Sequence, residues 1–149
     1  MAIDIRDYQP DDASPLVTLW RESFEHGVGV VDFHPVEEQL AYLRETLVPN
    51  HRVRLAWDGD ERVGFIAFTP ESIAQRYVRV SRIGQGIGTR LLDLAKAESS
   101  GGLWLFTFER NARARRFYER NGFVAVAHGF EPNWQLADVK YAWGRPPAA

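Results

Sequence analysis

Three alternating glycines precede a helix-like segment and could bind an anion. Gly84, Gly86 and Gly88 leave the backbone nearly unobstructed, and residues 89–97 then have the apolar spacing of a helix. The free N–H groups in the first turn of such a helix, together with the positive end of its dipole, attract phosphate. The pattern predicts a phosphate or pyrophosphate site at residues 84–89.

Two common nucleotide-binding motifs do not fit this loop. A P-loop has a glycine, four further residues, and then Gly-Lys followed by Ser or Thr. Counted from Gly84, Thr89 stands in place of the second glycine and Arg90 in place of the lysine. A dinucleotide fingerprint requires a third glycine where Thr89 or Leu91 stands. Nucleotide and dinucleotide binding are therefore disfavoured, and a tight turn that merely starts a helix remains the alternative.

A second chemically suggestive segment covers residues 111–123. Asn111 and Tyr118 are seven residues apart, which returns to within about 20° of the same helical face. A phenol on that face could give a proton to a leaving group. Alternatively, Phe117 and Tyr118 form only the apolar face of the helix. Five arginines crowd residues 110–120, and Arg115 or Arg116 could reach a phosphate, although such runs are usually a solvated face.

Composition limits the classes of function. The chain has 149 residues, of which 45% are hydrophobic, which predicts one domain over residues 1–144 and a frayed tail at 145–149. A net charge of −2 argues against a nucleic-acid partner. The chain has no cysteine, and its four histidines lack metal-ligand spacing, so no metal is expected. No apolar run or signal segment suggests a membrane, and the cytoplasm is the expected location.

Hydrophobic patterning predicts alternating strands and helices. We expect strands at 2–6, 52–57, 63–68, 73–80, 103–108, 123–128 and 137–143, and helices at 12–24, 35–48, 89–97 and 111–120. This order predicts an α/β domain around one mixed sheet. Its two strand-helix-strand passages should pair in parallel through right-handed crossovers.

Two motifs together resemble the GNAT superfamily of acetyl-CoA-dependent N-acetyltransferases. They are Tyr77-Val78 followed by the glycine loop, and Asn-x-x-Ala-x-x-Phe-Tyr from Asn111 to Tyr118 with Gly-Phe after it. The element order fits across essentially the whole chain. The resemblance implies a single GNAT-like α/β (α+β) domain, with a mixed, mostly antiparallel twisted sheet of about seven strands and about four flanking helices.

The resemblance also implies a reaction and a cofactor site. The enzyme would move an acetyl group from acetyl-CoA to a primary amine by direct attack on the thioester. Tyr118 would be the general acid that protonates the departing thiolate. The residues implied in coenzyme A binding are Tyr77, Val78, Ile83, Gly84, Gln85, Gly86, Ile87, Gly88, Thr89, Asn111, Arg115 and Tyr118.

Two positions depart from the family pattern, and the base is not identified. Val80 and Ile83 stand where members commonly have proline and then glutamine or arginine, so Arg82 is a candidate for the missing positive charge. The general base is left open between Glu71 and Glu109 at strand ends. The histidines His26, His34 and His128 are further candidates.

Acceptor recognition is expected in residues 24–36 and in the turn near the C-terminal end. The implied acceptor contacts are Phe24, His26, Phe33, His34 and Trp134. The acceptor would be an amine on a small molecule or a peptide, and its identity is open, as is homodimer formation. The alternative function is a non-catalytic acyl-CoA-binding or sensing module on the same fold.

Overall fold

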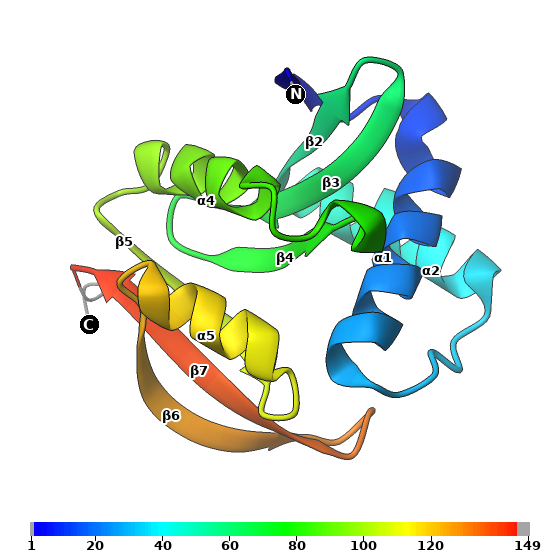
Figure 1. The fold of residues 1–149 in the computed structure, drawn as a ribbon. Helices are drawn as coiled ribbons and strands as arrows, with labels where there is room; N and C mark the ends of the chain where they lie inside the picture. The colour runs from blue at the N-terminus through cyan, green and yellow to red at the C-terminus, as the bar shows by residue number, and fades with distance from the viewer. Residues whose placement is uncertain (1, 146–149) are drawn as a thin grey trace.

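Residues 2–145, which the computed structural model describes, form seven strands and four α-helical regions (Figure 1). The strands are β1 (Ile3–Asp7), β2 (Arg52–Asp58), β3 (Glu61–Phe68), β4 (Ile73–Val78), β5 (Gly102–Phe108), β6 (Val124–Glu131) and β7 (Leu136–Gly144). The helices are α1 (Ala13–Val28), α2 (Val36–Tyr42), continued by a π-helical turn (Leu43–Leu47) and α3 (Val48–Asn50), then α4 (Ile87–Ala97) and α5 (Ala112–Arg120). The predicted fold class is confirmed.

The strands divide into two antiparallel sheets, in the orders β1-β2-β3-β4 and β5-β7-β6. A single parallel bridge between Ser72 and Trp104 joins them, so the expected mixed sheet is split between β4 and β5. The predicted parallel pairing of the strands flanking α5 is wrong, because β7 lies between β5 and β6 and pairs antiparallel with both. A short turn joins β6 to β7, so these consecutive strands pair antiparallel as a hairpin. This pairing replaces the parallel crossover that was predicted between the strands on either side of α5.

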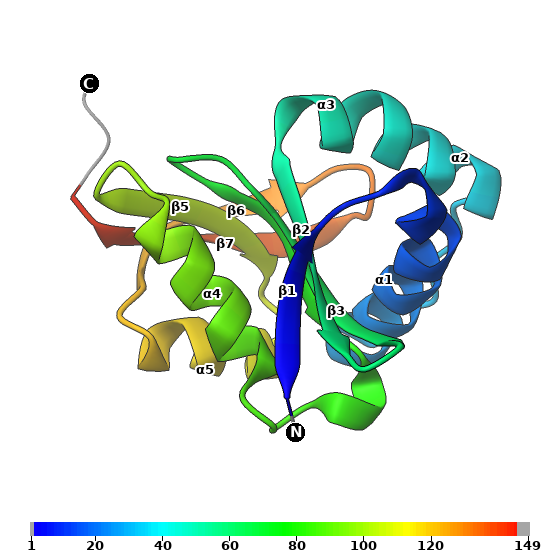
Figure 2. The same ribbon diagram turned by 90° about the horizontal axis from the view of Figure 1, so that it is seen from above.

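Helices cover both faces of the sheets (Figure 2). The helices α1 and α2 lie on one side, whereas α4 and α5 lie on the other. Alternate residues of β3 supply the two cores: Ile66 and Phe68 join the cluster with α4 and α5, and Phe65 and Ala67 join the cluster with α1. Burial on both faces explains why residues 63–68 read as a continuous apolar run.

Two helix ends differ from the sequence prediction. Helix α1 continues to Val28 rather than residue 24, because Val28 is buried and Gly29 adopts the left-handed conformation (φ 78°) that ends the helix. The second helix runs past Pro49 to Asn50. The N–H of Val48 bonds to the carbonyl of Leu43, five residues back. This wider turn precedes a proline that has no N–H to donate.

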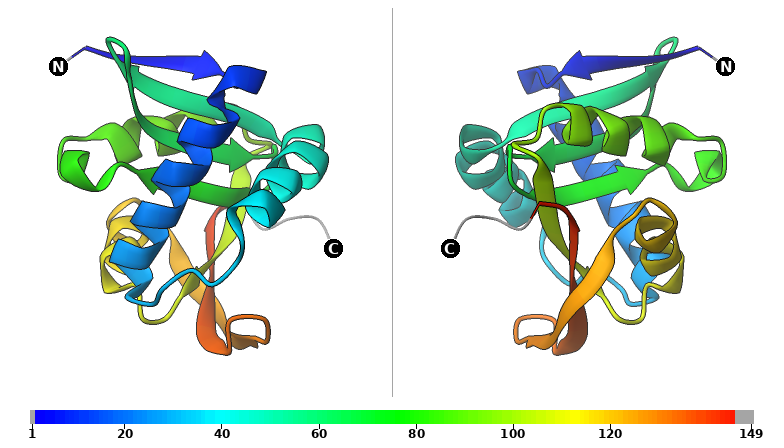
Figure 3. Two further views of the ribbon diagram at one scale, coloured as in Figure 1. Left: turned by 90° about the vertical axis from the view of Figure 1, so that its right-hand side faces the viewer. Right: turned by 90° about the vertical axis from the view of Figure 1, so that its left-hand side faces the viewer.

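The first strand and the last hairpin lie far apart in the molecule. Figure 3 shows β1 and the β6–β7 turn at opposite ends of the molecule. The N–H of Arg145 donates to the carbonyl of Gly101 at 2.8 Å, and the remainder of the predicted tail, 146–149, lies outside the described residues. Within residues 2–145, no helix has the length and apolar character needed to cross a membrane.

Candidate active site

The glycine loop provides an open helix N-terminus. Gly84 and Gly86 have φ values of 86° and 83°, a conformation that side chains other than glycine's rarely adopt, and Gly86 is the N-cap of α4. A Cβ built on either glycine meets no heavy atom within 4 Å. The space beside the loop is therefore open, and the first-turn residues Ile87, Gly88 and Thr89 line a cavity, as an anion site requires.

This loop forms one wall of a cavity of about 340 Å³, here called the glycine-loop cavity. Its described lining includes four arginines and no carboxylate; the arginines are Arg76, Arg82, Arg113 and Arg120. Nine of the predicted cofactor residues line it: Tyr77, Val78, Ile83, Gly84, Gly86, Ile87, Gly88, Thr89 and Asn111. The cavity brings them together with positive charge, which suits the phosphates of a nucleotide-like ligand.

Two arginines singled out from the sequence have other partners. Arg82 lines the cavity, but its guanidinium hydrogen bonds to Asp58 at 2.8 Å and Glu61 at 2.9 Å, and these carboxylates raise the pKa of Arg82. Arg115 lies outside the cavity lining, because its Nε donates to the hydroxyl of Tyr141 at 3.1 Å. The sequence suggested neither partner, since each pair joins segments distant along the chain.

The arginines of α5 that do line the cavity follow helical spacing. Arg113, Phe117 and Arg120 are three or four residues apart and share the face turned to the cavity. Phe117 is partly buried against the core formed with α4 and α5, and it also lies under Arg76, whose guanidinium carbon is 4.0 Å from the ring centroid. Arginine on an aromatic face holds its charge in place.

A smaller central cavity of about 50 Å³ lies where β4 and β5 separate. Asn111 and Tyr118 both line it, as their seven-residue spacing suggested. Asn111 caps α5, its side-chain oxygen accepting from the N–H of Ala114 at 3.1 Å. Tyr118 is buried, and its hydroxyl accepts a hydrogen bond from Nε of Arg76 at 3.0 Å. The hydroxyl proton of Tyr118 is therefore left for another acceptor.

A third cavity, of about 560 Å³, lies between α1, α2, β4 and the β6–β7 turn and is here called the aromatic cavity. Aromatic rings supply much of its wall: Trp20, Phe24, Tyr42, Tyr77, Phe108 and Trp134. Three carboxylates, Asp32, Glu38 and Glu131, also line it, whereas no lysine or arginine does among the described lining residues. Its charge is thus opposite to that of the glycine-loop cavity.

The predicted acceptor residues divide between these cavities. Phe24, His34 and Trp134 line the aromatic cavity, and His26 lines the glycine-loop cavity. Phe33 is 65% exposed and stacks on His34 with 4.4 Å between ring centroids.

One tyrosine connects the three spaces. Tyr77 lines the glycine-loop, central and aromatic cavities. Burial raises the pKa of Tyr77, and the nearby Tyr118 hydroxyl raises it further, so its phenol keeps its proton. A neutral tyrosine is therefore shared by the walls of all three cavities.

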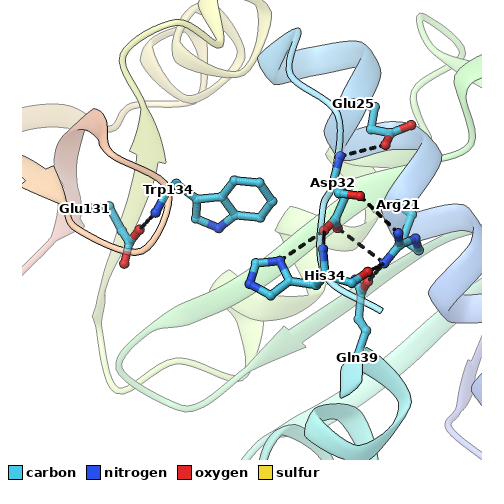
Figure 4. A network of polar contacts seen from close by, with 7 residues as sticks. All are labelled: Arg21, Glu25, Asp32, His34, Gln39, Glu131 and Trp134. Carbon is cyan, nitrogen blue, oxygen red and sulfur yellow. Dashed lines mark hydrogen bonds and ion pairs between the residues drawn. The ribbon is translucent and has the colours of Figure 1, made fainter. Parts of the chain in front are cut away.

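The carboxylates proposed as the base lie away from these spaces. Glu71 and Glu109 are exposed and line none of the three cavities, and the same holds for His128. His34, one of the histidines named as further candidates, instead borders the aromatic cavity, where it belongs to a polar network with Asp32, a residue that the sequence did not single out (Figure 4). Residues 2–145 contain no group of three or more histidine, cysteine or acidic side chains that could hold a metal ion.

Residues 49–125 match the family model described as an acetyltransferase (GNAT) domain. The chain belongs to the GNAT superfamily. It is also 30% identical, over 126 residues, to the peptidyl-lysine N-acetyltransferase YjaB of Salmonella typhimurium. That similarity covers 83% of this chain and 84% of the relative.

Solved structures show the same GNAT fold. The apo form of YjaB from Escherichia coli has a TM-score of 0.80 and 20% identity, covering 96% of this chain and 98% of that one. The PaiA N-acetyltransferase of Thermoplasma acidophilum, solved in complex with coenzyme A, has a TM-score of 0.76 and 18% identity. It covers 97% of this chain and 100% of its own. These findings confirm the family that the two sequence motifs indicated.

Proposed function

We propose that this GNAT protein transfers the acetyl group of acetyl-CoA to the side-chain amine of a lysine in a peptide or protein. The observation that carries the proposal is the pair of oppositely charged cavities that both include Tyr77. The arginine-lined space suits the phosphates of coenzyme A, and the carboxylate-lined space suits an ammonium group. The relative YjaB is a peptidyl-lysine N-acetyltransferase.

The cofactor would lie along the glycine loop and between the two sheets. The first-turn N–H groups of α4 would bind the pyrophosphate, and Arg113 and Arg120 would contribute positive charge. The acyl end would point to the central cavity, because this cavity shares Arg76, Tyr77 and Asn111 with the glycine-loop cavity. The thioester would then lie beside Tyr118.

Tyr118 would act as the general acid. Its hydroxyl accepts from Arg76 and can donate its own proton to the sulfur as the C–S bond breaks. The positive charge of Arg76, in contact with the same oxygen, stabilises the phenolate that forms. Arg76 is therefore a positioning residue for Tyr118, and packing of its guanidinium on Phe117 fixes its place.

The acceptor would enter through the aromatic cavity. The aliphatic stem of a lysine fits among the rings of Trp20, Phe24 and Trp134, and its ammonium would be drawn by the surrounding carboxylates. Phe33, at the rim and largely exposed, offers an apolar contact for residues that flank the lysine.

An acceptor panel tests the proposal. The protein is incubated with acetyl-CoA and a lysine peptide with a blocked N-terminus, free lysine, spermidine or a peptide with a free N-terminus, while coenzyme A thiol is measured. Mass spectrometry locates the acetyl group. We expect the blocked lysine peptide to be acetylated with the highest kcat/KM. Tight acetyl-CoA binding with no thiol release above background for any amine would instead support the non-catalytic binding module.

A further inference from the structure

A carboxylate and an imidazole are held together at the edge of the aromatic cavity. Nδ1 of His34 lies 3.0 Å from Oδ1 of Asp32, whose side chain is only 5% exposed. The backbone N–H of His34 donates to the same oxygen at 3.0 Å. Figure 4 shows the imidazole between the indole of Trp134 and the carboxylate of Asp32. The two residues form a compact unit on the segment between α1 and α2.

The carboxylate partner determines which imidazole nitrogen carries the proton. An ionised carboxylate only accepts hydrogen bonds, so Nδ1 of His34 must donate to Asp32. In the neutral ring, Nε2 is then the nitrogen with a free lone pair. Within the described part of the chain Nε2 makes no hydrogen bond, and His34 lines the aromatic cavity. This arrangement is that of an imidazole prepared to accept a proton.

Neighbouring groups hold the pair rigidly. Arg21 donates to the carbonyl of His34 at 2.7 Å and to the side-chain oxygen of Gln39 at 2.8 Å, and it lies 3.8 Å from the Asp32 carboxylate. The ring of His34 stacks on Phe33 and meets Trp134 edge-on at 4.9 Å. The charged groups around the imidazole are Asp32 on its own segment, Arg21 and Glu25 on α1, Glu38 on α2 and Glu131 on β6.

We infer that His34 is the general base that deprotonates the acceptor ammonium and that Asp32 is its positioning residue. This inference rests on the proposed function. An ammonium nitrogen has three protons and the amide product has one. Nε2 of His34 takes the first proton, directly or through one water, and releases it to solvent. The nitrogen lone pair then forms the C–N bond to the thioester carbonyl as the C–S bond breaks.

Tyr118 completes the proton balance. Its hydroxyl proton goes to the departing sulfur, and the second proton lost by the nitrogen restores the hydroxyl through water. The carboxylates of the aromatic cavity favour binding of the charged ammonium, so a base at this position is needed before attack. His34 and Tyr118 thus act on the amine and on the thiolate respectively.

Comparison of two acceptors shows whether His34 is a general base or only contacts the acceptor. One is a blocked Gly-Lys-Gly peptide, whose amine is protonated at neutral pH, and the other is hydroxylamine, which is largely unprotonated there. The variant is His34→Asn, whose amide can still donate to Asp32. The matched control is His51→Asn, at a partly buried histidine that lines none of the three cavities and whose Nδ1 contacts the carbonyl of Leu47.

We expect His34→Asn to lower kcat/KM for the lysine peptide by about 10²-fold while the value for hydroxylamine stays within roughly threefold. Asp32→Asn should give a smaller loss in the same direction. With the lysine peptide, the rate of His34→Asn should depend on the fraction of free amine alone, so the rise of its rate with pH should move to more alkaline pH than in the wild type. His51→Asn should match the wild type with both acceptors.

Three results would overturn the assignment. An equal loss with both acceptors would make His34 a structural or binding residue, and an unchanged lysine profile would remove it from the reaction. Failure of the wild-type protein to acetylate either acceptor would overturn the proposed function and the base with it. Thermal unfolding with and without coenzyme A confirms that each variant is folded and binds the cofactor.

Discussion

Replacement of Gly86 by alanine tests the glycine loop with a nearly minimal change. Gly86 has φ 83° and its Cβ position is open, so the free protein bears only the backbone cost of a left-handed alanine. That cost is roughly 1–2 kcal/mol. Gly59 in the β2–β3 turn has φ 58° and equally open space, and it lines none of the three cavities. Gly59→Ala is therefore the matched control.

The ligand should distinguish the two variants. A methyl group at Gly86 would project into the space proposed for the pyrophosphate and weaken about one charge-assisted hydrogen bond. Such a bond is worth about 2 kcal/mol, or roughly 30-fold in affinity. Coenzyme A at 100 times the wild-type Kd stabilises that protein by about 2.7 kcal/mol. At the same concentration, Gly86→Ala should gain only about 0.9 kcal/mol, whereas Gly59→Ala should gain the full amount.

Thermal unfolding with and without coenzyme A measures both effects. Without ligand, each variant should unfold about 2–8 °C below the wild type, since 1 kcal/mol corresponds to about 2–4 °C at this size. Isothermal titration then gives the Kd directly. A folded Gly86→Ala protein that binds coenzyme A as tightly as Gly59→Ala would refute the role of the loop.

Three further predictions concern single side chains. Tyr118→Phe should lower kcat by about 10²-fold, with coenzyme A affinity within roughly threefold of wild type in calorimetry. Phe33→Ala should raise the KM of a peptide acceptor in steady-state kinetics and leave coenzyme A affinity unchanged, because the ring lies at the rim of the aromatic cavity. Because the pKa of Tyr77 is raised in the folded protein, its phenol loses its proton at lower pH in the unfolded chain than in the folded one. Denaturant unfolding should therefore show stability falling above about pH 10, less steeply in Tyr77→Phe.

The sequence was sufficient for features that depend on local geometry. Alternating glycines before an apolar period predicted the loop and α4, and a seven-residue spacing placed Asn111 and Tyr118 in one cavity. The same approach located β2 and β3, which were predicted as strands at 52–57 and 63–68. These elements follow from neighbouring residues, so tertiary contacts did not alter them.

Features that join distant segments were missed. Arg76 meets Tyr118 across 42 positions of sequence, and nothing in the β4 pattern distinguishes this arginine from a solvated one. The pairing of Asp32 with His34 is local, and the Asp-x-His spacing was visible. The role of this pair could not be predicted, because the contacts of Arg21 with Asp32 and the burial of Asp32 arise only when α1 packs against the segment.

The division of the sheet also bears on self-association. Two sheets have four edges instead of two, and unpaired strand edges are sites at which other chains can add and aggregate. Beyond the bridge at Ser72 and Trp104, the edges of β4 and β5 face one another across the central cavity and not outward. Of the outer edges, β1 has charged Asp4, Arg6 and Asp7, which discourage pairing. The additional edges created by the opening are therefore sheltered from intermolecular strand addition.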